Sequence, residues 1–510
     1  MGFLQRIQRL PWWVSCALPA AAFFAVSLAG LDRMPYFGND EIYPSSTALT
    51  FVREGRFARE ITAGSLGTND FDAYPPMWML LLAGTYKVFG VGIWTTRVPC
   101  IAVAALAIFF LAAAVYRITS SAARAALAGT LLSLDPILLH RARIGRSEPL
   151  ALMFLTLGLF AVSQPRRLWW WACGVSLVLG IASYQFAALP AVALGVGLLA
   201  AGALQRAIWV AAGGVTGVGL WCLWSFGHWD LFELQVLETG RSYSQPLVSA
   251  LLSEWQRYAA LAQRAPTLIP VLLLGPVVAL YWLRPRADVM TRAVCVASAV
   301  MLVLLAATGM KSAEFYYMFL TPFVYFVLAQ SSFAQRPAER RTATALVACS
   351  ALAGVVVLAG ISVKLSREWA CRDARSFDAK VAPILEPTIA AGKLVVGPTS
   401  IWLSTINRGG KLRVLFDAYG PHTETLLKGF FDDPRALSEA GVIALTESSD
   451  RLMERYPQLK DEIAQRIKVG SVSDPCGPTL FSLSFFERPA SHALRATEIK
   501  NVPNRFSSGE

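Results

Sequence analysis

Long apolar runs recur through the first 364 residues and constrain this chain more than any other feature. A helix that crosses a bilayer needs about 17–25 mostly apolar residues. Eleven segments approach that requirement, at residues 12–30, 97–116, 123–139, 150–163, 168–183, 186–204, 207–226, 267–283, 290–308, 315–330 and 342–363. Only 16% of the residues are charged, against about 25% in soluble domains. The sequence therefore predicts a polytopic α-helical membrane protein and excludes a soluble enzyme.

The charges predict the orientation of these spans. With a cytoplasmic N-terminus, the inner loops hold thirteen arginines and only two acidic residues. The outer loops before residue 365 hold fourteen basic and fourteen acidic residues. Because positive charge is retained on the cytoplasmic side, this orientation is favoured, and an odd number of spans places the C-terminus outside. The net charge of +12 is thus a topology signal and not a nucleic-acid-binding surface. A cleaved signal peptide is the alternative for the first span.

Three regions are expected to fold on the outer side. Residues 31–96 contain an apolar piece opened by two prolines, at 75–90, which is too short to span comfortably and predicts a juxtamembrane helix. Residues 227–265 mix tryptophan and tyrosine with charges, as interfacial segments do. The C-terminal part has ordinary charge density and turn signals. We therefore expect a transmembrane domain at 1–364 and a small extracytoplasmic α/β domain at 365–510.

The outer domain is expected to contain strands at residues 394–396 and 442–445. Cys371 and Cys476 are the only two of eight cysteines in this domain, so an oxidising compartment favours a disulfide between them. The other six lie in or beside the spans, where a thiol behaves as a small apolar group. Glycines in one span, at positions 213, 214, 217 and 219, indicate close packing against another helix.

Asp40 and Glu41 directly follow the first span on the outer side. An acid pair at that place has two interpretations. It can begin a helix, because carboxylates are stabilised by the positive end of the helix dipole, with residues 45–47 capping the next helix. It can also supply a general base for chemistry at the membrane surface.

Basic residues also lie on the outer side, against the general charge rule. A short turn, here called the arginine turn, carries Arg141, Arg143 and Arg146 directly before Glu148. A lone Lys311 precedes a tyrosine-rich helix start. These cations are either solvated anchors at the interface or ligands of a phosphate held beside an acid.

In their order along the chain, these residues resemble the GT-C glycosyltransferases that use polyprenyl-phosphate sugars. That family includes bacterial lipid A aminoarabinose transferases and protein O-mannosyltransferases. The matching elements are Asp40-Glu41, Pro75-Pro76, Arg97-Val98-Pro99, Glu148, and Lys311 with Tyr316, Tyr317 and Pro322. The match covers most of the membrane part. It departs from the family at Tyr74, where His or Lys is usual, and at Glu148, where Asp is commoner, and residues 365–510 resemble no particular domain.

The resemblance implies an inverting membrane glycosyltransferase that moves a sugar from a polyprenyl-phosphate donor to an extracytoplasmic lipid A, envelope glycan or protein. It implies the bacterial inner membrane, with the C-terminal domain in the periplasm. Asp40 is the expected general base, with Glu41 and Glu148 orienting acceptor or sugar. The ligands expected for the donor phosphate are Arg143, Arg146 and Lys311. No cofactor is required, although the outer acids leave a divalent metal as an alternative.

Two other classes of function are alternatives. A transporter or flippase for a lipid-linked sugar usually places ionisable groups at mid-membrane and shows related halves. Here nearly every charge before residue 365 lies at the end of a span or in a loop, which favours the enzyme. A non-catalytic scaffold of an envelope polysaccharide complex is the other alternative.

Overall fold

The computed structural model describes most of the chain. The described residues are 11–32, 39–62, 68, 70–73, 75–235, 247–280, 287–308, 314–334, 336–368, 374–415, 437–446, 449–473 and 482–488. The chain divides into two compact units. Unit 1 comprises residues 1–35, 73–88 and 93–365, and unit 2 comprises residues 36–72, 89–92 and 366–510. The expected division at residue 364 stays a prediction. The grouping of residues 36–72 with the C-terminal part did not follow from the sequence pattern.

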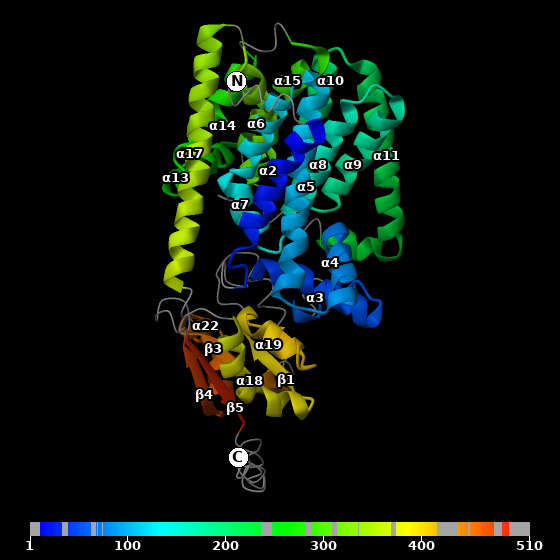
Figure 1. Ribbon diagram of the computed structural model, residues 1–510. Helices are drawn as coiled ribbons and strands as arrows, with labels where there is room; N and C mark the ends of the chain where they lie inside the picture. Colours follow the sequence, from blue (N-terminus) through cyan, green and yellow to red (C-terminus); the bar gives the residue numbers. More distant parts are fainter. Residues whose placement is uncertain are drawn as a thin grey trace, which may run out of the picture. The chain divides into compact units, whose positions relative to one another are not determined.

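Unit 1 is a helical bundle whose long helices run roughly parallel (Figure 1). Its α-helices are α2 (Trp12–Leu28), α4 (Pro76–Phe89), α5 (Ile93–Thr119), α6 (Ala122–Ser133), α7 (Pro136–Ala142), α8 (Glu148–Val162), α9 (Arg167–Ile181), α10 (Ala188–Ala200), α11 (Leu204–Ser225), α13 (Leu247–Arg264), α14 (Leu268–Val278), α15 (Val289–Thr308), α16 (Thr321–Ser331) and α17 (Pro337–Glu368). Short 3-10 helices are η3 (Gln185–Ala187), η4 (Phe226–His228) and η7 (Glu314–Phe319).

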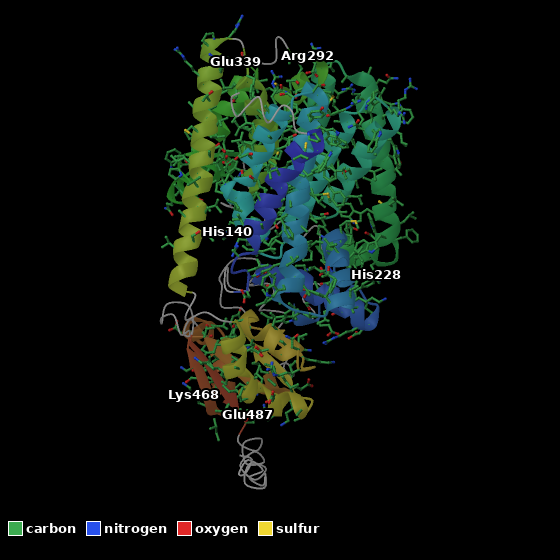
Figure 2. The ribbon with its side chains drawn as sticks, in the orientation of Figure 1. His140, His228, Arg292, Glu339, Lys468 and Glu487 are labelled. Atoms are coloured by element: carbon green, nitrogen blue, oxygen red, sulfur yellow. The ribbon has the colours of Figure 1, made fainter. Side chains whose placement is uncertain are left out.

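Several of these helices have the composition of membrane spans. Within the described residues, four helices are long and apolar enough to cross a membrane, or five if the bent pair α6 and α7 is one span. Shorter apolar helices of 10–17 residues accompany them. Figure 2 places Arg292 of α15 and Glu339 of α17 at one end of the bundle and His228 toward the other. A mostly helical membrane part is thus confirmed, while the count of eleven spans and their orientation stay predictions.

The span expected at residues 123–139 is broken. α6 and α7 replace it and are bent by 61° at their junction. Asp135 caps α7, because its Oδ1 accepts the backbone N–H groups of Ile137 and Leu138 at 2.9 and 2.8 Å. The fully buried carboxylate also accepts a hydrogen bond from Tyr325 at 2.8 Å. Asp135 therefore sets the start of the helix that leads into the arginine turn.

Small residues allow α9 and α11 to pack closely. A side chain at Gly213 would collide with a backbone carbonyl of α9, and one at Gly217 would lie 2.7 Å from a valine of the same helix. Nothing in the described part of the chain lies within 4 Å of the corresponding position at Gly214 or Gly219. The expected packing role is confirmed for Gly213 and Gly217 and is wrong for the other two.

Unit 2 combines α3 (Asn39–Glu54) and η1 (Glu60–Thr62) with a small α/β fold. The elements of that fold are α18 (Ala374–Ala390), β1 (Leu394–Gly397), η8 (Thr399–Ile401), α19 (Trp402–Ile406), β2 (Leu412–Val414), β3 (Ala440–Thr446), α22 (Ser449–Arg455), α23 (Pro457–Ala464), β4 (Ile467–Ser473) and β5 (Ser482–Glu487). The sheet has the order β2-β1-β3-β5-β4 (Figure 1). Its first three strands are parallel, and β5 runs antiparallel to both β3 and β4. The small C-terminal sheet domain is confirmed, including both expected strands.

Candidate active site

The arginine turn between α7 and α8 holds a cation against an acid. Glu148 is fully buried at the first position of α8, where the positive end of the helix dipole stabilises a carboxylate. Arg146 contacts both carboxylate oxygens, with Nε 3.0 Å from Oε2 and Nη2 2.7 Å from Oε1. The first contact is a charge-assisted hydrogen bond, which is stronger than a neutral one, and the second is an ion-pair contact without hydrogen-bond geometry. The structure thus brings together two of the expected site residues.

Arg143 is buried in the same turn and binds backbone oxygens. Its guanidinium donates to the carbonyl oxygens of Ser27 and Ala29, both at 2.8 Å, and to that of Gly30 at 3.4 Å. These carbonyls lie at the C-terminal end of α2, where backbone acceptors lack partners within the helix. Burial, together with the charge of Arg97, lowers the pKa of Arg143 to about 10, so the group is charged at neutral pH. Arg143 ties the turn to α2, and its role at a donor phosphate stays a prediction.

Two further motifs of the family resemblance pack against the arginine turn. Trp78 of α4, the helix expected after the two prolines, donates its indole N–H to the carbonyl of Gly145 at 3.2 Å. Cys100 of α5 lies 3.3 Å from two further carbonyl oxygens of the turn. Arg97, in the first turns of α5, is fully buried and donates to the carbonyl of Leu31 at 2.7 Å. Motifs separated by up to about 70 residues therefore converge on one turn.

Helix α3 of unit 2 carries the acid pair in its first turn. It begins at Asn39, so Asp40 and Glu41 are its second and third residues, and Glu41 is fully buried. The side chain of Asp40 is outside the described part of the chain. Residues 45–47 lie inside α3, so the expectation that they cap a following helix is wrong. The position of the acids agrees with stabilisation by the helix dipole, and their catalytic roles stay predictions.

Helix α3 is held by a buried ion pair in the segment after it. Arg59 contacts both carboxylate oxygens of Asp72, at 3.0 and 2.7 Å, and Thr47 of α3 donates to the same carboxylate at 2.6 Å. The Arg59 guanidinium also lies 5.2 Å from the centre of the Tyr43 ring. Asp72 is 1% exposed, so loss of either charge would leave the other buried and poorly compensated.

A buried charge pair on α13 was missed by the sequence reasoning. Glu254 and Arg257 form an ion pair of 2.8 Å one helical turn apart, and Tyr317 of η7 donates to Glu254. Arg257 is 1% exposed and donates to the carbonyl of Leu305 at 3.0 Å. Among the described residues, its Nε and Nη2 atoms have no hydrogen-bond partner. Burying a guanidinium whose nitrogens lack hydrogen bonds costs folding free energy, and an anion such as phosphate would complete its hydrogen bonding.

The pattern of α13 contains the signal that would have revealed this pair. Val248, Leu252 and Trp255 are between 66% and 76% exposed, whereas Glu254 and Arg257 point inward. The helix therefore turns its large apolar side chains outward and this charge pair inward. In the sequence, this arrangement appears as an acid and a base three residues apart, on the helix face opposite the large apolar side chains.

Short helix η7 connects this pair to the helix that precedes the arginine turn. It contacts α7, α13 and α16. Its Tyr316 ring lies 4.6 Å from Phe186 and 6.4 Å from Tyr184, measured between ring centres. The tyrosine-rich segment singled out in the sequence thus lies next to both groups of buried charges.

Three expected residues lie outside the described part of the chain: Lys311, Cys371 and Cys476. The phosphate contact of the lysine and the disulfide between the cysteines stay predictions. Within the described residues there is no group of three or more His, Cys, Asp or Glu side chains able to hold a metal ion.

Comparisons with known proteins agree with this geometry. Residues 73–228 match the family model described as dolichyl-phosphate-mannose-protein mannosyltransferase. The crystal structure of ArnT from Cupriavidus metallidurans bound to undecaprenyl phosphate is similar with a TM-score of 0.59 and 14% identity, covering 92% of this chain and 97% of that one. The chain has the GT-C fold. The resemblance inferred from its motifs is therefore confirmed.

Two other GT-C structures support the same assignment. ArnT from the same organism in the apo state has a TM-score of 0.56 and 13% identity, over 92% of this chain and 97% of that chain. AglB, the archaeal oligosaccharyltransferase from Archaeoglobus fulgidus, in complex with an inhibitory peptide and a dolichol-phosphate, has a TM-score of 0.52 and 11% identity, over 89% of this chain and 71% of that one. No curated protein sequence matches this chain significantly.

Proposed function

We propose that this GT-C protein transfers a sugar from a polyprenyl-phosphate donor to an extracytoplasmic acceptor, with inversion at the anomeric carbon. The acceptor class is a lipid A, an envelope glycan or a protein. The proposed location is the bacterial inner membrane, with the N-terminus in the cytoplasm and the C-terminal domain in the periplasm. Likeness to structures of proteins bound to undecaprenyl phosphate and to a dolichol-phosphate supports the donor class.

The reaction is a single displacement. The acceptor hydroxyl forms a bond to the anomeric carbon, Asp40 takes the hydroxyl proton, and the bond from that carbon to the phosphate oxygen breaks. The polyprenyl phosphate leaves with the electron pair, so cations must neutralise the charge that develops on it. Arg146 and Lys311 are proposed for that task, with Arg143 supporting the turn. Glu41 and Glu148 orient the acceptor and the sugar.

One observation carries the proposal: a GT-C fold holds the buried Arg146–Glu148 pair on the arginine turn. Two opposite charges in a largely buried turn provide the means to orient hydroxyls and to stabilise an anionic leaving group. Arg257 adds a second cation, because two of its nitrogens lack partners among the described residues. We include it with Tyr317 among the proposed phosphate ligands.

The proposed base is tested with Asp40→Asn. Asparagine preserves size and the helix start but cannot accept the proton, so turnover should fall by about 10²–10⁴-fold while the protein folds normally. The assay is transfer of labelled sugar from native membrane lipids by purified protein with saturating donor. Asp230→Asn is the matched control, because Asp230 is an exposed acid in unit 1 that is expected on the outer side.

Transfer by folded Asp40→Asn within about threefold of the parent would reject the base assignment and direct attention to Glu41 or Glu148. A parent protein that transfers no sugar but moves lipid-linked sugar across proteoliposome membranes would instead support the transporter alternative and reject the transferase.

A further inference from the structure

A cavity of about 800 Å³ lies within unit 2, at the amino ends of β1 and β2. Ligand sites in proteins usually enclose about 300–1,000 Å³, so the space is large enough for a mono- or disaccharide. One wall comes from α3, η1 and the chain around them, and the other from the C-terminal α/β fold. Leu49, Trp402 and Leu412 contribute apolar surface.

The wall formed by the α/β fold is basic. Lys393 precedes β1, and Lys411 and Arg413 belong to the turn and strand of β2, with Glu439 as the one acid lining this wall in the part of the chain that the structure describes. Three cations against one carboxylate attract a phosphate or carboxylate group. A side chain at Gly409 would meet nothing within 4 Å in the described part of the chain, so the backbone there is open, whereas one at Gly410 would collide with Ile389 and Thr405.

The opposite wall is polar, and its charges are Arg53 and Arg56 against Glu54, Glu60 and Asp70. Arg56 contacts Glu60 at 3.2 Å and also pairs with Glu54, so its charge is compensated within the wall. Ser46 and Thr50, one turn apart on α3, also line this wall, and the Thr50 hydroxyl donates to the carbonyl of Ser46 at 3.1 Å, which leaves its oxygen as an acceptor. Carboxylates and hydroxyls of this kind hydrogen-bond sugar hydroxyls, which are both donors and acceptors. The cavity therefore has a side for an anion and a side for a polyhydroxylated ring.

We propose that this cavity binds an anionic saccharide, and that this saccharide is the head group of the acceptor. The identification as acceptor rests on the proposed function. Helix α3 supports this identification. It carries Asp40 and Glu41 in its first turn, and its face formed by Ser46, Thr50 and Arg53 lines the cavity. At 1.5 Å per residue, this face begins about 7 Å along the axis from Glu41. A head group in the cavity thus contacts the element that bears the proposed base.

The experiment measures binding of soluble probes to the full-length protein in detergent by calorimetry. Glucose 6-phosphate and glucuronate test the two sources of negative charge, inorganic phosphate tests the anion alone, and glucose tests the ring alone. We expect saturable binding of at least one anionic sugar, at least tenfold tighter than glucose and tighter than phosphate. The Lys411→Ala/Arg413→Ala variant should weaken that binding tenfold or more, because charge-assisted hydrogen bonds are lost.

Lys468→Ala is the matched control, since Lys468 is exposed on β4, at the sheet edge opposite β2 (Figure 2). If the double variant is unstable, Lys411→Gln replaces it, and Lys411→Arg should restore binding. The proposal is overturned if neither anionic sugar binds, if phosphate binds as tightly as the sugars, or if the double variant binds like the control. The two walls would then serve only to hold α3 against the α/β fold.

A transfer assay separates this proposal from the proposed function. Binding of an anionic sugar by a protein that transfers no sugar would refute the transferase and leave the cavity as a saccharide site. Sugar transfer at limiting acceptor that is unchanged in Lys411→Ala/Arg413→Ala would refute the acceptor role alone. A raised acceptor KM with unchanged donor KM is the expected result.

Discussion

Removing the charge of Glu148 tests whether its pair with Arg146 holds the arginine turn. Glu148→Gln keeps the shape of the side chain but leaves the Arg146 guanidinium, whose side chain is 12% exposed, beside a neutral amide. Breaking a buried pair by removing one partner typically costs about 3–5 kcal/mol. Since Arg146 retains some contact with solvent, we expect the lower end, about 3 kcal/mol. Removing both charges in Arg146→Met/Glu148→Gln should recover a substantial part of that loss.

The assay is a double-mutant cycle on the free energy of unfolding in detergent, with each single variant and the double variant. The control cycle uses Arg56→Met and Glu54→Gln, because that pair is 49% and 40% exposed and is expected to contribute less than about 1 kcal/mol. Strictly additive losses at 146 and 148, or a loss below about 1 kcal/mol for Glu148→Gln, would show that the pair does not stabilise the turn.

Further predictions concern packing, pH, redox state and topology. Gly213→Ala should lower the unfolding midpoint clearly, whereas Gly214→Ala should leave it nearly unchanged; equal effects would contradict the α9–α11 contact. Burial alone would raise the pKa of Asp378, but hydrogen bonds from an arginine and a serine and the charge of that arginine hold it below its usual value. The stabilisation that ionised Asp378 gives the fold is therefore complete above about pH 4 and is lost as the pH falls further. Asp378→Asn should remove this contribution, which is less than about 1 kcal/mol in the free energy of unfolding, as measured by acid titration. Intact-mass measurement after alkylation of the denatured protein without reductant should find six of the eight cysteines labelled, and eight labels would rule out the disulfide between Cys371 and Cys476. A C-terminal reporter active only in the cytosol should be silent, and a strong signal would reverse the topology.

Local patterns predicted the local elements of this protein well. The helix after the two prolines is α4, and Gly90 at its end has a φ of +77°, a conformation that glycine adopts without strain. The strands expected at 394–396 and 442–445 are β1 and β3. In each case the signal lies within a few neighbouring residues, where hydrophobic pattern and turn chemistry act together.

The misses came from competition between signals. Hydropathy joined residues 123–139 into one span, but Asp135 followed by proline is a helix start, and its capping hydrogen bonds prevail. The pair of Glu254 and Arg257 was not singled out, because the average polarity of residues 227–265 does not show that the two charges share the inward face of α13. The interfacial position of that segment stays a prediction. Neither error is visible in composition, since each depends on which way a side chain points.

Contacts between distant parts of the chain could not be predicted from the sequence. Nothing in residues 36–72 indicates that they pack with the C-terminal α/β fold, because that association depends on contacts across some 300 residues of chain. The convergence of Trp78, Cys100 and the end of α2 on the arginine turn is likewise a property of the folded bundle. The family resemblance indicated that these motifs belong together without saying which atoms meet.

The membership of α3 in unit 2 has a consequence for biosynthesis. Ribosomes add about 5–20 residues per second, so the C-terminal part of the unit emerges about 15–60 s after α3 has been made. During that interval α3 lacks the strands β1 and β2 against which its unit is built. Packing of the acid-bearing helix within its unit is thus among the last steps in the folding of the chain.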